Sequence, residues 1–144
     1  MTTSLNSIDE LVDNFELLGD WESRFGYLID LGKELPPMNA ADQSEANRVH
    51  GCQAQVWMKL LPDADGRITI MADSDAFIVK GLIAVLLTIY SGKTAQEILD
   101  TDGPAKLDRL QLAEHLSPTR KNGLFAMVQR VRELAQAIEV EAAK

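Results

Sequence analysis

The chain contains a single cysteine, Cys52, within the run GCQAQVW that spans residues 51–57. One sulfur cannot form a disulfide within the chain and cannot hold a metal ion alone. Chemistry at Cys52 would therefore be that of one exposed thiol, or of a temporary carrier for another sulfur atom. The alternative is that Cys52 is a small buried hydrophobic residue, because free cysteine is among the most buried residue types.

Two residues just before Cys52 bear on this choice. Gly51 permits a sharp turn that would place Cys52 at a loop tip, although a glycine before a strand is also common punctuation. His50 could act as a base or as a positive neighbour if the turn brings it to the sulfur, and the alternative is an ordinary turn residue.

Length and charge limit the classes of function. The chain has 144 residues, the usual size of one domain, and a formal net charge of -8, which opposes binding to nucleic acid. The first basic residue is Arg24, whereas a secretory or mitochondrial leader needs early positive charge, so we expect a cytoplasmic protein. The longest apolar stretch, residues 81–90, is about half of a bilayer span, so no membrane insertion is expected.

Apolar periodicity and capping signals predict helices followed by a hairpin and then further helices. Residues 62–66, with Pro62 and Gly66, form the predicted hairpin turn. The predicted helices cover residues 8–18, 21–31, 76–90, 94–99, short pieces through Leu112, and a last helix from Ser117; the predicted strands cover 55–61 and 67–72, and residues 38–47 are a connection with at most a short helical turn. This order favours an α+β domain with a small antiparallel sheet covered by helices.

Four blocks then occur in order: VHGCQAQVW (49–57), ADSDAFIVKGL (72–82), YSGKTAQEI (90–98) and LSPTRKNGLFAM (116–127). Together they resemble the SufE family, sulfur-acceptor proteins that partner cysteine desulfurases in iron-sulfur cluster assembly. The N-terminal helices match that family in pattern only. One departure is Ala54, where family members often carry a serine.

The resemblance implies a single SufE-like domain over residues 1–144, with a SufE/IscU-like α+β fold whose hairpin-based antiparallel sheet has about three strands. It implies that Cys52 is the acceptor cysteine, Arg120 the arginine of the S-P-x-R block and Gln53 the polar neighbour of the sulfur. The expected donor is a pyridoxal-phosphate-dependent cysteine desulfurase of the SufS or CsdA type, which the chain would stimulate. The expected receiver is a cluster scaffold or another sulfur acceptor. The chain itself is expected to bind no cofactor or metal, and to be a monomer or weak homodimer.

The implied chemistry is transfer of persulfide sulfur onto Cys52, which makes the chain a carrier and activator rather than a stand-alone enzyme. Only a thiolate attacks, and an ordinary cysteine with a pKa of about 8.5 is a few per cent ionised near pH 7. Arg120 could supply the positive charge that favours the anion, or it is a solvated arginine at a helix start. An apolar recess would protect Cys52 from oxidation but raise its pKa, which leads to the hypothesis that the partner swings the loop outward.

Three other classes of function are alternatives to a sulfur acceptor. A cluster scaffold holds iron with several thiolates, and this chain has one. A cysteine-dependent hydrolase needs a base near the nucleophile, and only His50 and His115 are available. A non-catalytic interaction module, in which Cys52 is inert, remains a further alternative.

Overall fold

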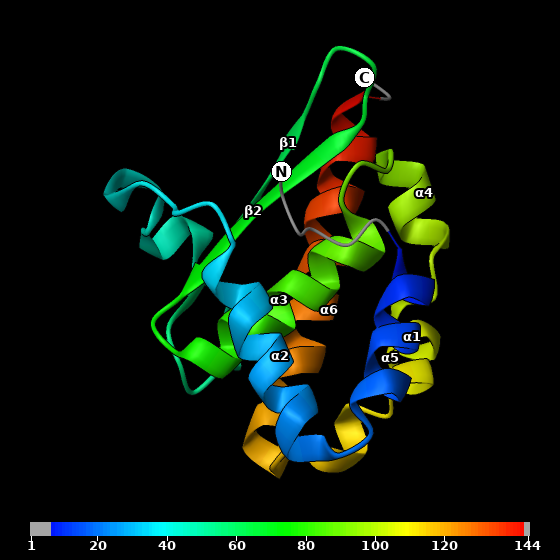
Figure 1. The fold of residues 1–144 in the computed structure, drawn as a ribbon. Coiled ribbons are helices and arrows are strands. Elements are labelled where there is room, and N and C mark those ends of the chain that lie inside the picture. The colour runs from blue at the N-terminus through cyan, green and yellow to red at the C-terminus, as the bar shows by residue number, and fades with distance from the viewer. Residues whose placement is uncertain (1–6, 143–144) are drawn as a thin grey trace.

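The computed structural model describes residues 7–142, which form an α+β fold (Figure 1). Within these residues the fold has six α-helices and one two-stranded antiparallel sheet, which packs mainly on α3 and α6. The helices are α1 (Ile8–Leu18), α2 (Trp21–Lys33), α3 (Phe77–Tyr90), α4 (Ala95–Asp100), α5 (Gly103–Leu110) and α6 (Pro118–Ala142), and the strands are β1 (Val56–Pro62) and β2 (Ile68–Ser74).

The predicted starts of α1, α2 and α4 are confirmed by their caps, whereas α3 begins after Ala76 without a side-chain cap. The Ser7 side chain accepts a hydrogen bond from the Glu10 backbone at 3.2 Å, and Asp20 accepts one from Ser23 at 2.8 Å. Thr94 and Glu97 form a reciprocal capping box at the start of α4. Such caps satisfy backbone N–H groups that have no partner inside a helix, so they fix where each helix begins.

The sheet is the predicted hairpin, but it has two strands instead of about three. β1 pairs with β2 from Val56 opposite Ser74 to Pro62 opposite Ile68. Before β1, Arg48 makes only an isolated bridge with Trp57. The short helical turn η2 (Glu45–Asn47) precedes this bridge and Gly51, with φ +91°, follows it, so the extended segment there is too short to become a strand.

The connection from α2 to β1 carries two short helical turns, η1 (Ala40–Asp42) and η2, where at most one was expected. It is tied to the sheet by an ion pair between Lys59 and Asp42, with Nζ and Oδ1 2.9 Å apart. The connection therefore enters the Cys52 loop from a fixed position beside the hairpin.

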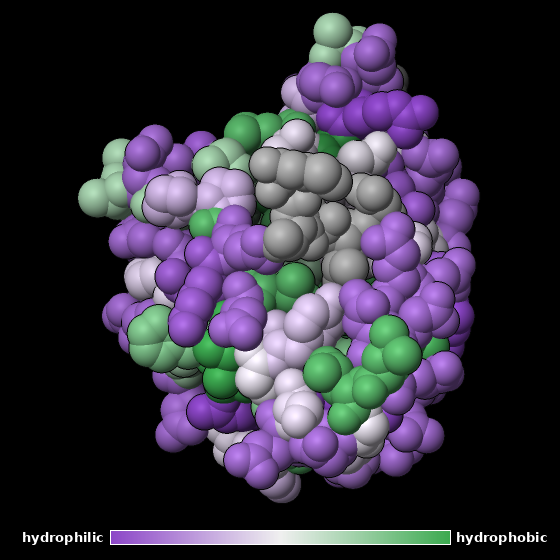
Figure 2. All heavy atoms as spheres, viewed as in Figure 1, coloured by the Kyte–Doolittle hydropathy of each residue, from purple (hydrophilic) through white to green (hydrophobic). Residues whose placement is uncertain are grey.

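Helix α3 lies at the centre of the core, as its nearly continuous apolar sequence predicted. It packs closely on α2, where a β-carbon added to Gly32 would come within 2.6 Å of the Gly81 backbone nitrogen. On the face seen in Figure 2, hydrophilic residues cover most of the surface and apolar residues form separate groups. The packed core, which includes residues of β1, α3 and α6, holds the start of β1, the start of α3 and the first turns of α6 in fixed positions.

Candidate functional site

Cys52 lies on a loop, residues 49–55, whose two ends are held by hydrogen bonds. At one end the Val49 backbone N–H donates to the Val56 carbonyl at 2.8 Å. At the other end Gln55 donates to the Asp75 carboxylate at 3.0 Å, and the Asp75 backbone donates back to the Gln55 carbonyl at 3.3 Å. The loop is therefore fixed at its base, while Cys52 itself makes one contact of this kind, donating from Sγ to the Gly123 carbonyl at 3.5 Å.

Gly51 gives the loop its turn. Its φ of +91° falls in a region that favours glycine, and a β-carbon at this position would lie 3.2 Å from the Ala126 β-carbon of α6. The sequence expectation that Gly51 shapes the loop thus has two physical bases, the backbone conformation and the close approach to α6.

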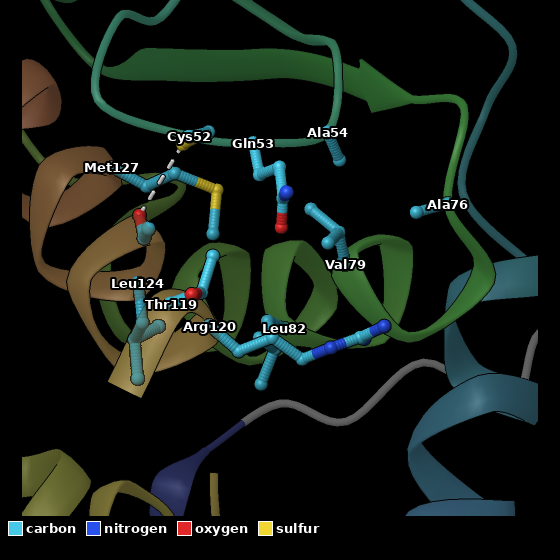
Figure 3. A pocket seen from close by; sticks show the side chains of 11 residues that line it. Cys52, Gln53, Ala54, Ala76, Val79, Leu82, Thr119, Arg120, Leu124 and Met127 are labelled. Carbon is cyan, nitrogen blue, oxygen red and sulfur yellow. Dashed lines mark hydrogen bonds between the residues drawn. The ribbon is translucent and has the colours of Figure 1, made fainter. Parts of the chain in front are cut away.

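The Cys52 side chain is half-buried and opens on a cavity of about 190 Å³ (Figure 3). Its walls come from the loop, α3 and α6, and are mostly apolar. They comprise Cys52, Gln53, Ala54, Ala76, Val79, Leu82, Thr119, Arg120, Gly123, Leu124 and Met127. The sulfur lies close to the α6 backbone at Gly123, where an added β-carbon would be in ordinary contact with Sγ at 3.5 Å.

The cavity places two of the predicted site residues near Cys52. Gln53 extends into the space from the loop, and Arg120 runs along the side away from Cys52 (Figure 3). The Arg120 side chain is exposed, and the guanidinium that favours the Cys52 thiolate is that of a different residue, Arg48.

His50 does not share this cavity. Its Nε2 atom lies 3.0 Å from the Glu45 carboxylate, and its side chain is 77% exposed. It lines a second hollow of about 470 Å³, on the other side of the loop, together with Glu45, Ala46, Arg48, Val49, Ala126, Gln129, Arg130 and Glu133.

Two opposing effects act on the acidity of the sulfur. Burial of Cys52 raises the pKa of its thiol above the ordinary value, and this effect is the larger one. The Arg48 guanidinium lowers the same pKa by favouring the thiolate. In the resting protein the neutral thiol is therefore the favoured form.

Sequence reasoning missed Arg48 and Gly123. Gly123 falls inside one of the four blocks, but nothing in the sequence joins it to Cys52 across 71 positions. Arg48 stands only four residues before the cysteine, so a search for permanent cations near Cys52 in sequence would have found it.

Residues 7–142 contain neither a cluster of metal-binding side chains nor a helix that could span a membrane. In this part of the chain no three His, Cys, Asp or Glu side chains come together in a group that could hold a metal ion. Among the same residues, no helix combines the length and apolar character needed to cross a membrane.

A helix-covered hairpin that presents one recessed thiol on a tethered loop defines a small α+β thiol protein. Comparison with known proteins then identifies its relatives. Residues 9–135 match the family model described as SufE, Fe-S metabolism associated domain. An uncharacterised SufE-like protein of Rhizobium meliloti is 40% identical over 135 residues, which covers 92% of this chain and 96% of the relative.

The chain therefore belongs to the SufE family and is a protein of Fe-S metabolism. Its fold is also similar to the solution structure of a hypothetical protein from Thermus thermophilus. The TM-score is 0.72 at 22% identity, with 90% of this chain and 93% of the other chain covered. This structural likeness concerns the fold alone, and it agrees with the α+β class predicted from the sequence.

Proposed function

We propose that Cys52 accepts persulfide sulfur from a pyridoxal-phosphate-dependent cysteine desulfurase of the SufS or CsdA type, in the cytoplasm. The protein thereby stimulates that enzyme and passes the sulfur on to a cluster scaffold or another acceptor. The observation that supports this most directly is the cavity of about 190 Å³ beside Sγ. An added sulfur atom is similar in size to a water molecule, which occupies about 30 Å³ in the liquid, so the site has room for it.

The transfer step is an exchange at sulfur. The Cys52 thiolate attacks the outer sulfur of the donor's persulfide, a new S–S bond forms on Cys52, and the S–S bond of the donor breaks. The electron pair of the broken bond leaves with the donor's cysteine as its thiolate. The outer sulfur keeps its oxidation state as it passes from one cysteine to the other, so no external oxidant or reductant is consumed.

The resting position of Cys52 does not suit this attack, because burial raises the pKa of the thiol. We propose that the docked desulfurase draws residues 50–54 outward. Cys52 is retained by one long contact to the Gly123 carbonyl, whereas the loop ends are held at Val56 and Asp75. Outward movement would therefore expose the sulfur without breaking the anchors at the loop base, and it would remove the burial that disfavours the thiolate.

The positions of the histidines disfavour the alternative of a cysteine-dependent hydrolase. His50 pairs with Glu45 and lines the other hollow. His115 stacks on Trp21, with ring centroids 3.8 Å apart. Neither histidine lines the Cys52 cavity, so neither is placed there as the general base that such a mechanism needs.

Intact-mass measurement tests the sulfur-acceptor function directly. The protein is incubated with a competent desulfurase and free cysteine, and the expected product carries one added sulfur, about 32 Da, as a persulfide. Because Cys52 is the single cysteine, Cys52→Ser should gain nothing. A wild-type protein that gains no sulfur would overturn the proposal.

Movement of the loop has its own test. Cys52 is alkylated in a time course, with and without the desulfurase, in which the enzyme carries a pre-blocked active-site cysteine. We expect faster alkylation in the complex. An equal rate in the free and bound protein would refute the outward movement while leaving the acceptor function open to the mass experiment.

A further inference from the structure

Arg48 is half-buried, and its cationic side chain has no ion-pair partner within residues 7–142. Its Nε atom is buried and makes no hydrogen bond, and no ion pair joins its guanidinium to any acid of residues 7–142. Leaving a buried N–H group of a guanidinium without a hydrogen-bond partner is unfavourable. An unpaired cation of this kind is expected beside a site where an anion forms during only one step of a reaction.

The acids that line the same hollow are already engaged elsewhere. Glu45 pairs with His50 at 3.0 Å, and Glu133 pairs with Arg130 at 3.4 Å. Neither carboxylate forms an ion pair with Arg48, although both line the same hollow. The positive charge of Arg48 is therefore available to an anion other than these two carboxylates.

Arg48 lies at the base of the loop that carries Cys52. Arg48 is fixed by its bridge to Trp57 at the base of the loop. Gly51 lies against Ala126, which also lines the Arg48 hollow, so the loop backbone runs between that hollow and the Cys52 cavity. Arg48 therefore lines the hollow on the other side of the loop from the Cys52 cavity.

We propose that Arg48 is a positioning residue that stabilises the anionic sulfur of Cys52, first as the thiolate that attacks and then as the persulfide that is carried. This role rests on the proposed function and adds to it the source of the positive charge. Before transfer, Arg48 favours the ionised nucleophile. After transfer, the terminal sulfur of the persulfide loses its proton to solvent, and Arg48 favours that anion over the neutral form.

The charged groups around the sulfur permit a clean measurement. Alkylation between pH 7 and 10 modifies the thiolate of Cys52, the single cysteine, and the charged or titratable side chains that line the two hollows are Glu45, His50, Arg48, Glu133, Arg130 and Arg120. The pH dependence of Cys52 reactivity in this window therefore reports ionisation of the sulfur and the influence of Arg48 on it.

The experiment follows alkylation by iodoacetamide, an uncharged reagent that Arg48 cannot attract, from pH 6.5 to 10.5 by intact mass. Arg48→Gln is expected to move the inflection upward and to lower the rate near pH 7.5 about three- to tenfold, the change that half to one pKa unit produces. The limiting rate at high pH should stay the same. Arg48→Lys, which keeps the charge, should recover much of the rate.

Arg130→Gln serves as the matched control, since Arg130 lines the same hollow but is paired with Glu133. It is expected to leave the inflection unchanged. An inflection in Arg48→Gln that equals the wild-type value would overturn the inference. So would a changed limiting rate without a shifted inflection, because that result would show a merely structural role.

The same variants are then loaded by a desulfurase and cysteine. A slower sulfur uptake by Arg48→Gln, restored by Arg48→Lys, is expected. Wild-type protein that takes up no sulfur defeats the acceptor function, whatever the alkylation profile shows. An unshifted alkylation profile defeats the role of Arg48, even where wild-type sulfur uptake is normal.

Discussion

Replacing Gly51 by alanine should strain the loop that carries Cys52 in two ways. The native φ of +91° disfavours a residue with a β-carbon by about 1–2 kcal/mol. The added β-carbon would also lie 3.2 Å from that of Ala126, inside the optimal carbon–carbon separation of about 3.5–4.0 Å. We expect the free energy of unfolding to fall by about 1–2 kcal/mol, which lowers Tm by about 3–6 °C for a chain of this size.

Urea denaturation followed by tryptophan fluorescence measures this loss, and a matched control separates its two causes. Gly66 has φ +80° and no atom within 4 Å of an added β-carbon, so Gly66→Ala measures the backbone cost alone. The contact with Ala126 is isolated by a cycle of Gly51→Ala, Ala126→Gly and the double variant. The helix-propensity cost of Ala126→Gly, about 1 kcal/mol, cancels in that cycle.

The strained loop has an alternative to unfolding, since residues 50–54 can move outward and release the strain. In that case the stability loss is limited to the free energy of loop opening, and Cys52 should be alkylated faster than in the parent at a pH where both are ionised. Unchanged stability combined with an unchanged alkylation rate would refute the interpretation of Gly51. A coupling energy near zero would refute the contact with Ala126.

Three further outcomes follow from the site. Because burial raises the Cys52 pKa, the thiol's contribution to stability is fully present below the ordinary cysteine pKa and is lost as pH rises through the higher native pKa. Urea denaturation from pH 8 to 10.5 should therefore show a smaller loss of stability for Cys52→Ala than for the parent. His50→Gln should leave the pH dependence of Cys52 alkylation unchanged, because His50 is paired with Glu45 outside the sulfur cavity; a shifted inflection would restore the histidine as a base. Phe77 is 67% exposed and follows Ala76, a wall of the cavity, so a desulfurase that reaches Cys52 would cover it. Phe77→Ala should weaken desulfurase binding in calorimetry while leaving Cys52 alkylation in the free protein unchanged, and equal affinities would contradict this placement.

The sequence predicted those parts of the fold whose causes are local. Ser7, Asp20 and Thr94 mark helix starts because a cap acts within three residues. The hairpin turn was likewise readable from Pro62 and Gly66. The expected third strand was wrong, because its pairing depends on how far the chain stays extended before Gly51, and η2 ends that extension early.

The site itself was predicted less completely, because its parts meet only through the tertiary fold. Cys52 and Gln53 are neighbours in sequence, and the four blocks brought Arg120 into consideration. The structure places Arg120 on the side of the cavity away from Cys52 and gives the electrostatic effect on the sulfur to Arg48 (Figure 3). That distinction depends on which side of the loop each guanidinium approaches, and residue type alone does not determine it.

Protection of the Cys52 sulfur from oxidation requires burial, whereas its reactivity requires ionisation. Different parts of the loop meet these two requirements. Burial against α6 and the Gly123 carbonyl favours the neutral thiol, which resists oxidation, while Arg48 favours the anion. Arg48 is joined to the loop base, which is anchored to β1, whereas burial depends on the contact of residues 50–54 with α6. Outward movement of the loop would therefore remove the burial while leaving the anchor of Arg48 in place. The acidity of Cys52 would then rise when a partner holds the loop open, without any change in the core.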